Sequence, residues 1–242
     1  MSSVEVCLSP DLYACRKTQG NNHIALVVDV LRASSTIIVA IEQGVQKLIP
    51  ITDMSKLSEL KKNGYLIISE RDGLPADFAD FGNSPLQILN ASVKNAAMAI
   101  CTTNGTRALS VASEAEKTVI GSFANMSALC NSLKEWNKDV VIVCAGWKSR
   151  FSLEDVLFAG AVCEQLTENT HFSSDDDSVI AAIELWKNAK DNIIDYISRS
   201  EHYKRLFDLG MGESVSYCFK VDTCSVVPVL IKGSIVNYLI EN

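Results

Sequence analysis

The sequence has no hydrophobic run long enough to cross a membrane. Its longest apolar runs, such as Ile24 to Val28 and Val226 to Ile231, are far shorter than the roughly 20 residues that a bilayer span requires. The first fifteen residues contain Glu5 and Asp11 and no basic residue, so they show no pattern of a secretory signal. We therefore expect a cytoplasmic protein that has no membrane partner.

The chain also has little positive charge. It carries 22 basic and 29 acidic residues, a net charge of −7, and the basic residues are scattered as singles and pairs. A protein that binds nucleic acid needs a basic stripe or patch, so this class is disfavoured. The apolar fraction of 48% over 242 residues is enough to fill a core, which excludes a disordered chain.

Metal-binding patterns of cysteine and histidine are missing. There are only three histidines, and the eight cysteines include no C-x-x-C pair. Several cysteines lie inside apolar stretches, among them Cys101, Cys144 and Cys163, which is typical of reduced core thiols. Zinc is therefore disfavoured, and we expect any catalytic metal to be a hard ion held by carboxylates.

What the sequence does have is an alternation of short apolar runs with helical patterns. This alternation predicts βαβ units and an α/β protein with a largely parallel sheet, in which an antiparallel pair is also allowed. We expect one α/β domain over residues 1–242. It would comprise two similar halves at about 20–80 and 95–155, a helical C-terminal part at about 152–220, and a closing strand pair at about 225–240.

The two halves share a short pattern. Asp53-Met54-Ser55 followed by Leu57 recurs 72 residues later as Asn125-Met126-Ser127 followed by Leu129. This recurrence favours an internal duplication of βαβαβ units, although any two βαβ units resemble each other to some degree. In an open α/β sheet, ligands bind outside the carboxyl ends of the strands, so we expect the loops at those ends to share one crevice.

The first such loop joins an apolar run to a helix that begins near Ala33. It contains a carboxylate, Asp29, which can hold Mg²⁺ or attack phosphorus, and a guanidinium, Arg32, which can bind two phosphoryl oxygens. Hydroxyls at the start of the helix would help to bind one anionic group: Ser34, Ser35 and Thr36. An N-cap hydroxyl beside a surface arginine is the alternative.

The second loop, residues 102–107, has the same place in the other half. Gly105 could adopt a positive φ and bring backbone N–H groups close to an anion. We expect this loop to bind a second anionic group through Thr103, Asn104, Gly105, Thr106 and Arg107. The alternative is a plain Asn-Gly turn.

Two further strand-end loops combine acids and bases. Glu70 is a candidate metal ligand, and Arg71 a candidate substrate contact that an exposed ion pair would explain equally well. The last loop offers the cations Lys148 and Arg150, with the candidate metal ligand Asp155 just beyond them.

A different chemistry is also encoded in two places. Cys101 with Arg107, and Cys144 with Arg150, have the C-x₅-R spacing of phosphatases that use a cysteine nucleophile. Neither cysteine has a histidine before it, and both follow aliphatic residues. A cysteine nucleophile stays an alternative.

Several longer stretches carry a family resemblance. They are VVDVLRASST, SERDG, FGNSP, TTNGTRAL, GSFANMSAL, CAGWKSRFSLEDVLFAG and YCFKVDTCSVVPV, which together run through most of the chain. With these motifs the sequence resembles the 2-phosphosulfolactate phosphatase family of coenzyme M biosynthesis.

The resemblance implies a three-layer α/β/α fold and a magnesium-dependent hydrolase of the phosphate ester of phosphosulfolactate. Combined with the loops above, it implies catalytic roles for Asp29, Arg32 and Glu70, with Mg²⁺ near the carboxylates. The substrate would be a small anionic phosphate ester. Another phosphate ester, a non-catalytic polyanion-binding protein and a homo-oligomer are left open.

Overall fold

The computed structural model describes residues 1–16, 20–148, 150–168 and 170–238. Its strands form one sheet in the order β4-β5-β3-β10-β9-β6-β2-β7-β1-β8. In chain order they are β1 Ser2–Cys7, β2 Ile24–Val28, β3 Lys47–Pro50, β4 Leu66–Ser69, β5 Ala97–Cys101, β6 Lys117–Gly121, β7 Val140–Cys144, β8 Phe172–Ser173, β9 Pro228–Ile231 and β10 Ser234–Asn237.

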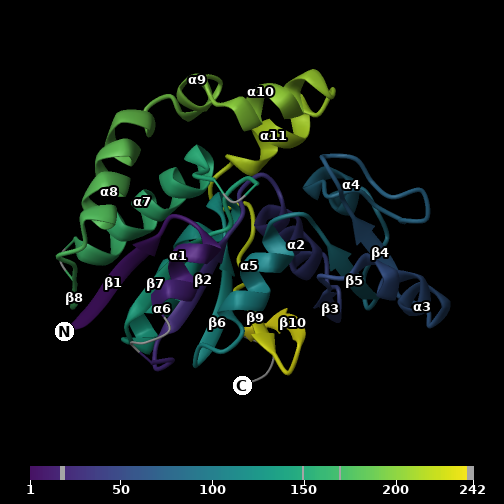
Figure 1. Cartoon of the computed structure of the whole chain (residues 1–242), viewed down its shortest axis with the longest axis horizontal. Coiled ribbons are helices and arrows are strands. Elements are labelled where there is room, and N and C mark those ends of the chain that lie inside the picture. Colours follow the sequence, from purple (N-terminus) through teal and green to yellow (C-terminus); the bar gives the residue numbers. More distant parts are fainter. Residues whose placement is uncertain (17–19, 149, 169, 239–242) are drawn as a thin grey trace.

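Helices connect most of these strands (Figure 1). The α-helices are α1 Pro10–Cys15, α2 Ala33–Glu42, α3 Leu57–Lys62, α4 Pro85–Leu89, α5 Gly105–Ala112, α6 Met126–Trp136, α7 Leu153–Thr167, α8 Asp177–Ala189, α9 Ile193–Ile197, α10 Glu201–Asp208 and α11 Gly212–Cys218, with 3₁₀ turns η2 Met54–Lys56 and η3 Phe123–Asn125. Within the described residues, no helix is both long and apolar enough to cross a membrane.

The sheet is mixed but mostly parallel, which confirms the predicted α/β class. Strands β4, β5 and β3 are parallel to one another, and so are β6, β2, β7, β1 and β8. The β9–β10 hairpin joins the two groups by antiparallel pairing with β6 and β3. The predicted closing strand pair is therefore present. Residues 239 and 240, at the end of its predicted range, lie outside the described residues.

The order of elements repeats along the chain. Strand, helix, strand, 3₁₀ turn, helix and strand follow one another from β2 to β4 and again from β5 to β7. In the sheet, the first strand of each series is inserted between two strands of the other series. Strand β5 lies between β3 and β4, and β2 lies between β6 and β7. The repeated order agrees with a duplication, and the boundaries of the two halves stay a prediction.

Helices pack on both faces of the sheet, as the three-layer prediction requires (Figure 1). On one face, Leu129 of α6 and Phe158 of α7 belong to a core cluster with alternate residues of the strands. On the other face, Ile38 of α2 and Leu109 of α5 belong to a second cluster. Strands β2 and β7 are buried at every position, which explains why each is a continuous apolar run.

The predicted helical C-terminal part is interrupted. After α7 the chain forms the two-residue strand β8, which pairs in parallel with the first residues of β1, before α8 begins. The last three helices, α9 to α11, then cross the top of the molecule in Figure 1. Helix α10 contributes side chains to a pocket that also contains residues from four strand-end loops.

Candidate active site

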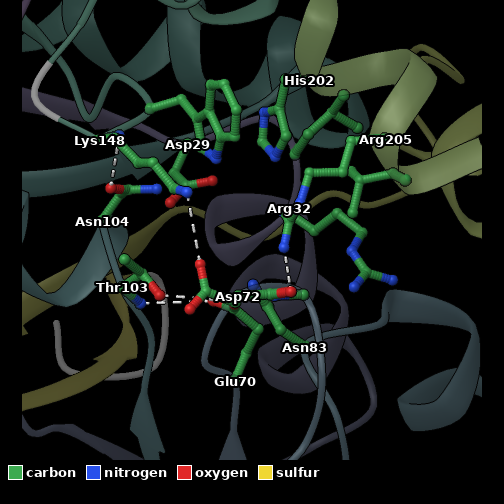
Figure 2. A pocket seen from close by; sticks show the side chains of 14 residues that line it. Asp29, Arg32, Glu70, Asp72, Asn83, Thr103, Asn104, Lys148, His202 and Arg205 are labelled. Carbon is green, nitrogen blue, oxygen red and sulfur yellow. Dashed lines mark hydrogen bonds and ion pairs between the residues drawn. The ribbon is translucent and has the colours of Figure 1, made fainter. Parts of the chain in front are cut away.

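A pocket of about 410 Å³, partly open to solvent, lies at the carboxyl ends of the parallel strands. Loops after β2, β4, β5 and β7 line it together with α10. Its lining residues are Asp29, Leu31, Arg32, Glu70, Asp72, Gly73, Asn83, Thr103, Asn104, Trp147, Lys148, His202, Arg205 and Leu206. The shared crevice predicted for the four loops therefore exists, and many of its side chains are charged (Figure 2).

Asp29 lies at the end of β2 and is 7% exposed. One of its carboxylate oxygens accepts a hydrogen bond from the Ala33 N–H at the start of α2, at 3.1 Å. Burial raises the pKa of Asp29 to about 6, against the opposing effects of the Ala33 N–H and of His202. The negative charge of Glu70 also raises this pKa. A cation bound here would therefore stabilise the carboxylate form of Asp29.

Arg32 is a buried cation in the same loop. It is 4% exposed, and Nη1 donates to the Ser214 hydroxyl at 3.3 Å. Desolvation lowers the pKa of its guanidinium, while Glu70 and Asp29 act in the opposite direction. Holding an arginine at this depth costs free energy, which a bound anion would offset.

Glu70 lies where the loops after β4 and β5 meet. Its carboxylate accepts hydrogen bonds from the Gly73 N–H, from the Thr103 N–H at 3.4 Å and from the Thr103 hydroxyl at 3.5 Å. The contact explains why the two loops enter the pocket side by side (Figure 2).

Gly105 has a different role from the one predicted. It does not have the positive φ expected from the sequence. A Cβ atom at this position would lie 2.5 Å from the Cβ of Ala33 and 2.8 Å from Oδ2 of Asp29. Glycine is therefore needed because the first residues of α5 and α2 approach each other too closely for any side chain.

The loop after β7 and helix α10 meet at an aromatic stack. The rings of Trp147 and His202 are 5.3 Å apart between centroids and inclined by only 11°. The Lys148 N–H donates to the Asn104 side-chain oxygen at 3.3 Å, and its ammonium lies 3.7 Å from the Asp72 carboxylate (Figure 2). These contacts fix the loop after β7 against the loops from the other parallel group of strands.

Behind the stack is a buried acid–base pair. His202 Nδ1 lies 2.6 Å from Oε1 of Glu154, whose side chain is 2% exposed. Burial opposes ionisation of Glu154, but the hydrogen bond and charge of His202 outweigh it, so that the pKa of Glu154 is lower than usual.

Asp155, a predicted metal ligand, is placed outside the pocket lining. It is 2% exposed, and its oxygens accept hydrogen bonds from the Val30 N–H at 2.9 Å and the Gly146 N–H at 3.1 Å. Burial, together with the charges of Glu154 and Asp29, raises its pKa well above the usual range. Its carboxylate joins the loops after β2 and β7 and thereby positions the pocket residues.

Six residues predicted from the sequence line the pocket: Asp29, Arg32, Glu70, Thr103, Asn104 and Lys148. The other predicted hydroxyl residues, Ser34, Ser35, Thr36 and Thr106, lie outside its lining because they are buried within the loops and helices. Ser34 and Ser35 donate to the carbonyls of Val27 and Val30, and Thr106 donates to that of Thr102. Thr36 is fully buried in α2.

Three predicted arginines also lie outside the pocket lining. Arg71 donates to Met54 Sδ at 3.0 Å, and Arg107 forms an ion pair with Asp11. Arg150 is exposed and is connected to Trp147 through backbone hydrogen bonds. Of the four arginines predicted in the strand-end loops, Arg32 alone therefore lines the pocket.

The cysteines of the two C-x₅-R patterns do not line the pocket either. Cys101 and Cys144 are fully buried, and burial raises the pKa of both thiols. A buried thiol with a raised pKa is a poor source of thiolate at neutral pH. The geometry therefore disfavours both cysteines as nucleophiles.

Sequence reasoning missed the contribution of α10. His202 and Arg205 lie far along the chain from the strand-end loops and belong to no motif that was recognised. The scarcity of histidine was a usable signal, because with three histidines in the chain each could have been considered in turn. Asn83 and Trp147, also missed, lie within recognised motifs.

The comparison with known families agrees with this geometry. The family model described as 2-phosphosulpholactate phosphatase matches residues 7–233. The chain belongs to the 2-phosphosulfolactate phosphatase family. As a member of this phosphatase family it is a phosphoric monoester hydrolase, so the alternative of a non-catalytic polyanion-binding protein is wrong.

Individual relatives of the family are similar over most of their length. A protein of Caldanaerobacter subterraneus, named probable 2-phosphosulfolactate phosphatase, is 38% identical over 212 residues, which cover 86% of this chain and 88% of the relative. A protein of Thermotoga maritima with the same name is 35% identical, over 86% of this chain and 89% of the relative. One of Clostridium acetobutylicum, also with this name, is 33% identical, over 88% of this chain and 92% of the relative.

Proposed function

We propose that this family member is a magnesium-dependent phosphatase that hydrolyses 2-phosphosulfolactate to sulfolactate and phosphate. The observation that carries the proposal is the charge arrangement in the pocket, where the carboxylates Asp29 and Glu70 share one space with the cations Arg32, Lys148 and Arg205. A pocket that only bound anions would gain nothing from carboxylates beside them, because like charges repel.

The donor set fits Mg²⁺ better than a softer metal. Among the described residues there is no group of three or more His, Cys, Asp and Glu side chains that could hold a metal. Mg²⁺ does not need one, because it is usually bound by one or two carboxylates together with water and substrate phosphate. Asp29 and Glu70 would hold the ion. When bound, it neutralises negative charge on the phosphoryl oxygens.

The cations can be divided between the two ends of the substrate. Arg32 lies beside Asp29, so we assign it to the phosphoryl group, where its planar guanidinium can contact two oxygens. Lys148 and Arg205 come from the loop after β7 and from α10, and we assign them to the sulfonate and carboxylate. Thr103 and Asn104 lie on the Lys148 side of the same pocket and can donate hydrogen bonds to a bound anionic group (Figure 2).

The test is phosphate release by the purified protein. We expect release from 2-phosphosulfolactate to be lost after treatment with EDTA and restored by Mg²⁺. We also expect kcat/KM to be much lower for phospholactate, which has a hydrogen in place of the sulfonate. Full activity in EDTA would overturn the metal assignment, and equal kcat/KM for the two esters would overturn the substrate assignment.

We further propose that the protein works in the cytoplasm. All eight cysteines are free thiols, and seven of them are buried. A reducing compartment preserves such thiols. Fractionation of the source cells with an antibody against the protein tests this location, and recovery outside the cytoplasm would contradict it.

A further inference from the structure

The buried pair of Glu154 and His202 connects two distant helices at the pocket. Glu154 is the second residue of α7, and His202 is the second residue of α10. Their side chains meet at 2.6 Å, and His202 continues into the pocket lining while Glu154 stays behind it. The pair therefore has one member that can touch a substrate and one that cannot.

The imidazole ring of His202 is held in two ways. The stack on Trp147 fixes the plane of the ring, and the hydrogen bond to Glu154 fixes its rotation within that plane. Because Nδ1 faces Glu154, Nε2 is the ring nitrogen that remains for the pocket. Such control of both plane and tautomer is what a proton-transfer group requires, since proton transfer depends on short, well-directed hydrogen bonds.

The electrostatics of the pair suit a proton donor. The doubly protonated ring carries a positive charge, which the Glu154 carboxylate neutralises at 2.6 Å. His202 is also close enough to Asp29 for its charge to act on that carboxylate. His202 therefore lines the same pocket as Asp29, which we assign to the metal, and Arg32, which we assign to the phosphoryl group.

Hydrolysis of an alkyl phosphate needs such a donor. When the bond between phosphorus and the ester oxygen breaks, the oxygen takes the electron pair and leaves as an alkoxide unless it receives a proton. The guanidinium groups of Arg32 and Arg205 hold their protons too tightly to supply it. Histidine, by contrast, gains and loses a proton near neutral pH, and His202 is the histidine in the pocket lining.

We propose that His202, positioned by Glu154, is the general acid that protonates the leaving oxygen of the substrate. A water oxygen attacks phosphorus, the bond to the ester oxygen breaks, and the Nε2 proton moves to that oxygen to give the alcohol. One proton of the attacking water stays on the phosphate product. The other proton is transferred to the ring and restores its protonated form. The inference rests on the proposed function only in that the substrate is an alkyl phosphate monoester.

The experiment compares two leaving groups in two variants. An aryl ester, p-nitrophenyl phosphate, expels a stable phenolate that needs no acid, whereas 2-phosphosulfolactate expels an alkoxide. In His202→Gln we expect kcat for the alkyl ester to fall by about 10²–10⁴-fold, the usual contribution of general acid–base catalysis. For the aryl ester we expect a fall of less than about tenfold on the same grounds. His171→Gln, an exposed histidine away from the pocket, is the matched control and should change neither rate.

Glu154→Gln tests the positioning role. It keeps the size of the side chain but removes the charge that faces the ring. We expect the same selectivity, with a smaller loss of kcat on the alkyl ester, little change in KM, and almost no loss on the aryl ester. Loss on both esters to the same degree would show that Glu154 supports the structure of the pocket only.

Two results would overturn the proposal for His202. One is an equal loss of kcat on both esters in His202→Gln, and the other is unchanged kcat on the alkyl ester. If neither variant folds, the wild-type enzyme can be tested with a series of esters. A weak dependence of kcat/KM on the acidity of the leaving alcohol supports an acid catalyst, and a steep one contradicts it. Failure of the wild-type enzyme to hydrolyse any of these esters would instead count against the proposed function.

Discussion

The loops after β2 and β5 occupy matching places in the repeated order of elements, yet they contribute different chemistry. In each loop a side-chain oxygen accepts a hydrogen bond from a backbone N–H in the first turn of the following helix. Asp29, the first residue after β2, accepts the N–H of Ala33, and Thr102, the first residue after β5, accepts the N–H of Thr106. Both acceptors are four residues before their donors, so the two turns are built alike.

The difference lies in where each arginine falls relative to its helix. Arg32 precedes the first residue of α2 and lies in the pocket, 4% exposed. Arg107 is the third residue of α5, and its side chain is 47% exposed and paired with Asp11. A shift of a few residues along a helical turn changes the side on which a side chain projects. Two similar loops therefore place one arginine in the pocket rather than two.

Replacing Asp29 with asparagine makes the first loop resemble the second, in which the uncharged side chain of Thr102 accepts the backbone N–H. We expect Asp29→Asn to keep the hydrogen bond from the Ala33 N–H and to lower kcat/KM by about 10³-fold or more, on the order of 4 kcal/mol of transition-state stabilisation. Steady-state kinetics measure the loss. The unfolding temperature of the wild-type protein should also rise with added Mg²⁺, and that of the variant should not. If the variant keeps the kcat/KM of the wild type, Asp29 has no role in the reaction.

The contrast between the two arginines can be measured directly. Arg32→Ala should lower kcat by about 10²–10³-fold, because its contact with the phosphoryl group strengthens as charge develops. Arg32→Lys should recover only part of this loss, because an ammonium group cannot make a planar two-point contact.

Arg107→Ala is the matched control for Arg32→Ala. The exposed pair with Asp11 contributes little to stability, so kcat and KM should both stay within about threefold of wild type, well under 1 kcal/mol. Equal losses in the two alanine variants would show that both loops bind substrate after all.

The contact between the two loops should be sensitive to a single methyl group. Gly105→Ala introduces a Cβ that would lie 2.5 Å from that of Ala33, so α5 and α2 would have to move apart. We expect a loss of about 1–3 kcal/mol in the free energy of unfolding, which is usual for overpacking. Urea denaturation measures it. Ser110→Ala, at an exposed position of α5, is the control and should be close to neutral.

The smallest effects are expected at the cysteines of the C-x₅-R patterns. Cys101→Ser and Cys144→Ser should each keep kcat/KM within about tenfold of wild type, a loss of under ~1.4 kcal/mol, because both thiols are buried with raised pKa values. In the native protein a thiol reagent should react fastest with the exposed Cys15 and leave activity intact. A loss of several orders of magnitude in a folded variant would revive the cysteine nucleophile.

The sequence by itself determined the fold class and six of the fourteen residues that line the pocket. Runs such as Ile24 to Val28 predicted buried parallel strands because such strands are covered on both faces. Polar residues directly after these runs, including Asp29 and Glu70, could be assigned to one crevice because the strands of a parallel sheet end at a common edge.

Only the tertiary structure decided which of those residues point into the crevice. In the sequence, Arg32 and Arg107 look equivalent because each follows a strand and lies near the start of a helix. The structure shows that Arg32 precedes its helix and that Arg107 lies inside its own. The sequence alone predicts the first residue of a helix only to within a few positions. The tertiary structure also decided that Asp155, predicted to be a metal ligand, accepts hydrogen bonds from two backbone N–H groups outside the pocket lining. Finally, it brought α10 over the strand ends, placing His202 beside residues more than fifty positions away, because contacts between distant segments arise from packing and leave no local pattern in the sequence.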